Sequence, residues 1–144
     1  MTVEVTDDDS ALGANKMEEV MGSDESNFED EFPLWDYDSA LKRMRGKVER
    51  LEKMINLFVT EMDSYRDSLE KAFKSGDIEQ AKIDAHTIKG AAANISALRL
   101  QESSALIESA FKEGDLAQVG AQWELFNQSY NDSNAHFKSW LDNR

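Results

Sequence analysis

Apolar residues recur at spacings of three and four along most of this chain, and that period is typical of amphipathic helices. The pattern predicts one short helix, which begins near Asp36 or Asp38 and ends at Met44, followed by four long helices. The long helices span about residues 47–74, 77–95, 97–113 and 115–141. No segment alternates apolar and polar residues over a useful length, so we predict no β-strand.

The segments between the predicted helices carry residues that end one helix and begin the next. Gly46 follows the short helix, and Gly76 is placed to end the long helix after it. Asp77 then begins a capping box with Gln80, and a second Gly-Asp pair separates the last two helices. Turns as short as these make consecutive helices antiparallel. We therefore predict an all-α fold, an antiparallel up-down-up-down four-helix bundle with a short N-terminal helix across one end.

The helix over residues 77–95 has an unusual outer face. Its buried stripe consists of small and branched apolar residues, namely Ile78, Ala81, Ala85, Ile88, Ala92 and Ile95. His86 falls outside this stripe. The residues on the neighbouring face are Lys82, Lys89, Gly90 and Ala93. A glycine inside a helix costs about 1 kcal/mol relative to alanine, so we infer that this face is kept flat for a partner.

His86 has the chemistry of a phosphate carrier. Imidazole is largely neutral at neutral pH, so that one ring nitrogen is free to attack. Lys89 lies three residues further along the helix, where its ammonium group can reach a phosphoryl group on the ring. Phosphoryl transfer asks a protein mainly for positioning and charge neutralisation. The spacing alone leaves open the alternative that His86 is an ordinary surface histidine.

The stretch His86-Thr-Ile-Lys89-Gly90, with the small residues after it, resembles the signature of the histidine-containing phosphotransfer (HPt) domain family. The resemblance covers the chain from about Tyr37 to the C-terminus, and it implies the same four-helix bundle. The family usually has a glycine six residues after the motif glycine, whereas this chain has Ser96 there. Ser96 is able to cap the next helix instead.

The resemblance also implies a function. His86 is expected to accept a phosphoryl group through Nε2, and Lys89 to neutralise its charge. Gly90, helped by Ala93, is expected to let a receiver domain approach closely. The implied partners are a response-regulator receiver domain, a hybrid sensor histidine kinase, or both. The chain would then be a phosphocarrier of a two-component phosphorelay, without autonomous kinase activity or a cofactor of its own, since the Mg²⁺ is expected on the receiver.

Three further residues are candidates for contact with the histidine or the partner: Lys82, Glu108 and Lys112. Glu108 and Lys112 stand where members of the family often place polar side chains that face the histidine. A carboxylate there would orient the imidazole through its second nitrogen. The alternative is an ordinary exposed ion pair between residues four apart on one helix, and the sequence leaves both interpretations open.

Composition and charge limit the remaining possibilities. The 144 residues suit one folded domain, and the absence of cysteine excludes disulfides and thiolate zinc sites. The net charge of −13 argues against nucleic acid and anionic membranes as partners. Residues 1–32 hold most of the acidic excess, so we expect them to form a disordered tail or linker before a bundle over residues 33–144. We expect a cytoplasmic monomer, either free-standing or part of a larger hybrid kinase.

Three other functions are less consistent with the sequence. A helical adaptor that binds receivers without carrying phosphate is the main alternative. A metal-dependent helical-bundle enzyme is disfavoured, because His86 and His136 are far apart and no Glu-x-x-His motif is present. We predict no metal site and treat His136 as structural or exposed. An acidic mimic of nucleic acid would have to act through residues 1–32.

Overall fold

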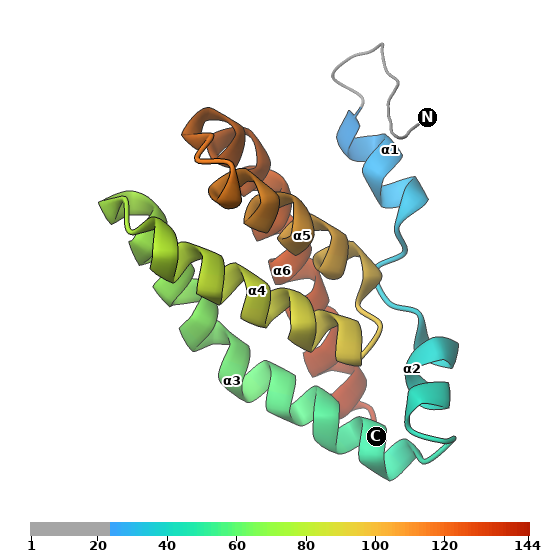
Figure 1. The fold of residues 1–144 in the computed structure, drawn as a ribbon. Helices are drawn as coiled ribbons and strands as arrows, with labels where there is room; N and C mark the ends of the chain where they lie inside the picture. Colours follow the sequence, from blue (N-terminus) through green and yellow to red (C-terminus); the bar gives the residue numbers. More distant parts are fainter. Residues whose placement is uncertain (1–23) are drawn as a thin grey trace. The chain divides into compact units, whose positions relative to one another are not determined.

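The structure is a computed structural model that describes residues 24–144, and every regular element in that range is a helix (Figure 1). The chain divides into two compact units, residues 1–31 and 32–144. In the first unit, the described part is helix α1 (Asp24–Glu31). The apolar pattern predicts no helix there, because the segment is almost entirely polar. The disorder predicted for residues 1–32 concerns mostly residues 1–23, and these lie outside the described residues.

The second unit is a bundle of antiparallel helices (Figure 1). Its elements are α2 (Tyr37–Arg43), α3 (Val48–Ser75), α4 (Ile78–Asn94), α5 (Leu98–Lys112) and α6 (Leu116–Asp142). Helices α3 to α6 each contact the next in chain order, and α6 also contacts α3. The predicted all-α bundle with a short N-terminal helix is therefore confirmed. Each helix of the described part is too short or too polar to cross a lipid bilayer.

Aspartate side chains begin three of these helices. Asp36, Asp77 and Asp115 each accept a hydrogen bond from the backbone N–H three residues further on, which satisfies a donor that the helix leaves unpaired. Gly76 ends α3 in the left-handed conformation, at φ +79°. These contacts explain why α4 begins directly after the turn, and they fix where His86 falls along that helix.

The core packs α4 closely against its neighbours. The α4 residues that face the core are fully buried, and most are alanines: Ala81, Ala85, Ile88 and Ala92. Larger buried side chains come from the other helices, among them Leu51, Leu69, Leu100, Phe111 and Phe126. Because alanine ends at a single methyl group, the backbone of α4 lies near the adjacent helices. His86 stands on the opposite, outer side of this close-packed helix.

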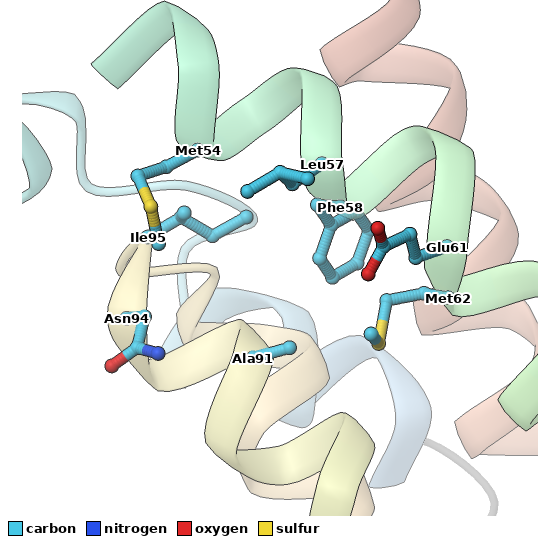
Figure 2. A pocket seen from close by; sticks show the side chains of 8 residues that line it. All are labelled: Met54, Leu57, Phe58, Glu61, Met62, Ala91, Asn94 and Ile95. Carbon is cyan, nitrogen blue, oxygen red and sulfur yellow. The ribbon is translucent and has the colours of Figure 1, made fainter. Parts of the chain in front are cut away.

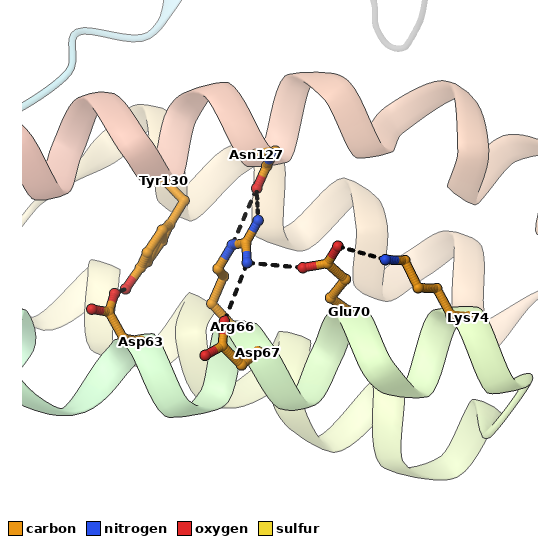
Figure 3. Close-up of polar contacts among 7 residues, drawn as sticks. All are labelled: Asp63, Arg66, Asp67, Glu70, Lys74, Asn127 and Tyr130. Carbon is orange, nitrogen blue, oxygen red and sulfur yellow. Dashed lines mark hydrogen bonds and ion pairs between the residues drawn. The ribbon is translucent and has the colours of Figure 1, made fainter.

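Polar contacts join α3 to α6 across the remaining side of the bundle (Figure 3). Arg66 donates through Nη2 to Oδ1 of Asn127 at 2.7 Å and through Nη1 to Glu70 at 2.9 Å. Tyr130 donates its buried hydroxyl group to Asp63. Burial, together with this contact, raises the pKa of Tyr130 well above its usual range. These contacts close the bundle between its first and last long helices.

The segment before α2 is attached to the end of the bundle by Trp35. Its indole N–H donates to the carbonyl of Ile95 at 2.7 Å, and its ring meets Phe137 and Trp140 edge-on. His136 is exposed and packs its ring 5.5 Å from that of Trp35. Trp35 thereby ties the N-terminal segment to the turn that follows α4.

Ser96 occupies this turn in a conformation that favours glycine. It is buried with φ +57°, and its hydroxyl group lies 3.2 Å from the hydroxyl of Ser39. Its carbonyl accepts a hydrogen bond from the N–H of Asp36 at 3.0 Å. The prediction that Ser96 caps the next helix is wrong, because Ala97 is the N-cap residue of α5 and makes no side-chain cap. The tight turn typical of a glycine is kept, and the serine bears the backbone strain.

We expect Ser96→Ala to lower the free energy of unfolding by about 1 kcal/mol, because it removes the hydrogen bond to Ser39 and keeps the strained backbone. Ser96→Gly removes the same bond but relieves a left-handed penalty of about 1 kcal/mol. The glycine variant should therefore remain close to the wild type. Urea denaturation of both variants measures the difference. Equal losses in the free energy of unfolding would contradict the conclusion that the backbone of Ser96 is strained.

Candidate functional site

His86 lies on the outer face of α4 with 68% of its side chain exposed. The fully buried alanines of the same helix hold this face outward, because the opposite side of α4 is committed to the core. The imidazole is thus open to a second protein, while its helix packs against α3 and α5. An exposed ring on a rigid helix is suited to group transfer with an external partner.

Glu108 is the buried group at the centre of the site. It comes from α5, and only 6% of its side chain is exposed. One carboxylate oxygen, Oε2, lies 2.9 Å from Nδ1 of His86. The other, Oε1, accepts a hydrogen bond from Nζ of Lys89 at 2.5 Å. Lys112 adds a longer ion pair, with Nζ 3.6 Å from Oε2. One carboxylate therefore holds the imidazole and two ammonium groups together.

The charge state of Glu108 follows from these contacts. Burial raises the pKa of this carboxyl group, whereas the hydrogen bonds from Lys89 and His86 and the positive charges of Lys89 and Lys112 lower it. The lowering effects prevail, so the pKa of Glu108 lies below its usual value and the group is ionised at neutral pH. The cations therefore offset the cost of burying this charge.

The carboxylate also selects the tautomer of the histidine ring. An ionised carboxylate accepts hydrogen bonds and donates none, so Nδ1 of His86 must carry the proton. In the neutral ring, Nε2 then keeps its unshared electron pair. The arrangement leaves a nitrogen nucleophile on an exposed ring, with the ammonium group of Lys89 nearby.

The remaining predicted residues surround this centre without joining it. Lys82 pairs with Glu79 on its own helix, with Nζ 3.1 Å from Oε2. Gly90 is exposed, and a Cβ atom built on it would meet nothing within 4 Å. Ala93 is half-buried. Within residues 24–144, no three His, Asp or Glu side chains form a group that could hold a metal ion.

The structure adds apolar surface that the sequence did not single out. Ile83, three residues before His86, is 57% exposed. A shallow groove, here called the α3–α4 groove, is lined by Met54, Leu57, Phe58, Glu61, Met62, Ala91, Asn94 and Ile95 (Figure 2). Its α4 side begins at the residue after Gly90. Ile83 is apolar but lies outside the buried stripe of α4, and that mismatch was the available sequence signal.

Comparison with known proteins shows what this site belongs to. A model of the Hpt domain family matches residues 53–140, which include α4, α5 and every predicted site residue. The chain belongs to the Hpt domain family. The resemblance inferred from the histidine motif is confirmed.

The fold of this Hpt domain is similar to that of a solved relative, histidine-containing phosphotransfer protein B (HptB) from Pseudomonas aeruginosa PAO1. The two share 20% sequence identity with a TM-score of 0.70, and the match covers 78% of this chain and 97% of the HptB chain. Similarity at this identity establishes the shared fold. A comparison with curated protein sequences gave no match.

The lowered pKa of Glu108 predicts a pH dependence of stability. Its ionised form stabilises the fold fully above the pKa of an unfolded glutamate, about 4.3, and this contribution is lost as the pH falls through the lower pKa of the folded state. We therefore expect the wild type to have a larger free energy of unfolding than Glu108→Gln at pH 7, and this difference to shrink as the pH falls below 4. Thermal denaturation of both proteins across that range tests this, and a constant difference would contradict it.

Proposed function

We propose that this Hpt domain accepts a phosphoryl group on Nε2 of His86 and relays it to or from an aspartate of a receiver domain in a two-component system. One observation carries the proposal. The exposed ring of His86 bonds a buried carboxylate through Nδ1 and lies beside the ammonium group of Lys89. This geometry supplies a nucleophile in the correct tautomer, together with a cation for the group it receives.

The reaction requires little movement within the domain. Nε2 attacks the phosphorus atom of an aspartyl phosphate, the N–P bond forms, and the P–O bond breaks with its electron pair returning to the aspartate. The Nδ1 proton stays in place and donates to Glu108. Lys89 neutralises negative charge on the transferred group. The Mg²⁺ and the acidic pocket belong to the receiver, and the chain acts as a phosphocarrier without kinase activity of its own.

The partner is a receiver domain, free or within a hybrid sensor histidine kinase, and it docks over the outer face of α4. Gly90 is open at the centre of this face and Ala93 lies one turn away. The exposed side chain of Ile83 adds apolar contact area, and Lys82 and Lys112 supply positive charge at the rim. A face with this combination suits a partner whose acidic pocket surrounds a phosphoaspartate.

His86→Gln should abolish phosphorylation, because glutamine has no nucleophilic ring nitrogen. The wild type, incubated with phosphorylated receivers of the same organism, should gain the mass of one phosphoryl group in an acid-labile form. Mass spectrometry of the intact protein measures this gain. His136→Gln is the matched control and should be labelled as the wild type is. A wild type that binds receivers but is never labelled would identify a helical adaptor instead.

Gly90→Gln should slow transfer by tenfold or more, because a long side chain would stand where the receiver approaches. The same change should preserve or raise stability by up to about 1 kcal/mol, since glycine is a poor helix residue. Gly120→Gln is the matched control, because Gly120 is also exposed and helical with no atom within 4 Å of a built Cβ. It should gain stability without slowing transfer. Normal transfer by Gly90→Gln would disprove the flat-face argument.

A further inference from the structure

Lys89 is already paired in the structure. Its ammonium group lies 2.5 Å from Oε1 of Glu108, and its side chain is 31% exposed. The cation that is expected to neutralise a phosphoryl group on His86 is therefore bound to a carboxylate before any phosphoryl group arrives. A phosphoryl group on the ring would have to draw Lys89 away from Glu108 or share it.

Glu108 is well placed to keep Lys89. The carboxylate is buried, so solvent ions screen its charge less than they would on the surface. Its other oxygen is shared between Nδ1 of His86 at 2.9 Å and Lys112 at 3.6 Å. Lys112 is 61% exposed and at the longer distance, so Lys89 is the principal counterion of the carboxylate. Once His86 is phosphorylated, the ammonium group of Lys89 thus has two possible anionic partners, the carboxylate of Glu108 and the phosphoryl group.

We propose that Glu108 keeps phosphorylated His86 labile by competing with the phosphoryl group for Lys89. The inference rests on the proposed function, because it concerns the lifetime of the phosphoryl group on the same ring. The phosphohistidine lacks part of the charge neutralisation that a free lysine would give it. A group held in this way is released readily to an acceptor, as a relay requires.

The hydrogen bond to Nδ1 and the charge of Glu108 are separable. In Glu108→Gln, the amide oxygen can still accept from Nδ1–H, whereas the NH₂ group cannot hold an ammonium ion. This substitution keeps the orientation of the ring and frees Lys89. If Glu108 served only to orient the ring, the glutamine variant would behave as the wild type does.

Phosphoramidate serves as the phosphoryl donor, so that no particular receiver is needed. Nε2 of His86 attacks its phosphorus atom, the N–P bond forms, and the P–N bond of the reagent breaks to release ammonia. During hydrolysis, water attacks the phosphorus atom and the electron pair of the broken bond returns to Nε2. After removal of the reagent, ³¹P NMR at neutral pH follows the half-life of the phosphohistidine.

We expect Glu108→Gln to lengthen this half-life by about tenfold, which corresponds to an increase of about 1.4 kcal/mol in the activation free energy of hydrolysis. In a Lys89→Gln background the same substitution should change the half-life by less than about twofold, because the competition needs Lys89. Glu70→Gln is the control, since Glu70 also pairs with two cations, Arg66 and Lys74, but on α3. It should leave the half-life unchanged.

Two results would overturn the proposal. One is a half-life in Glu108→Gln that equals or falls below that of the wild type, and the other is an equal lengthening with and without Lys89. A measurement on the wild type avoids any dependence on folding of the variants. The ¹⁵N signal of the Lys89 ammonium should shift on phosphorylation, while that of Lys74 stays constant.

The same experiment separates this proposal from the function on which it rests. If phosphoramidate labels the wild type no more than His86→Gln, then His86 is not a phosphoryl acceptor and the proposed function fails. If the wild type is labelled but Glu108→Gln decays at the same rate, only the competition for Lys89 fails.

Discussion

A single buried negative charge organises the site of this Hpt domain. The carboxylate of Glu108 lies between α4 and α5 and contacts the ring of His86 and the ammonium group of Lys89. An unpaired charge at that depth would cost several kcal/mol, so the lysines and the imidazole must stay near it. The same contacts that stabilise the carboxylate therefore determine which nitrogen of His86 is protonated and where the neighbouring cation rests.

The helices around the charge make this arrangement rigid. Asp77 and Gly76 set the start of α4, and Ser96 with Trp35 secures its far end. The ring of His86 is exposed, but the helix that carries it is held at both ends and along its inner face. The outer face of α4 is consequently a preformed surface, which would need little ordering on contact with another protein.

The sequence predicted the helices because their apolar period and their turn residues agree, as at Gly76 and Asp77. The motif also singled out His86, Lys89 and Gly90 as candidate site residues, because they lie within one turn and a half of a single helix. The contact between His86 and Glu108 spans 22 residues and two helices, so no spacing rule could decide between that contact and an ordinary surface ion pair. Ser96 was misjudged because it is the left-handed residue that ends α4, where its N–H donates to the carbonyl of Ala93, and a serine does not indicate that conformation as a glycine would.

The alanines on the inner side of α4 limit which substitutions the core of this domain can accept. Each contributes one methyl group to a fully buried contact, so a larger residue at Ala85 or Ala92 has no room and must push the helix outward. The ring of His86 would travel with the backbone and leave the carboxylate of Glu108. Interior volume on one side of the helix is thus tied to the contact between His86 and Glu108 on the other side.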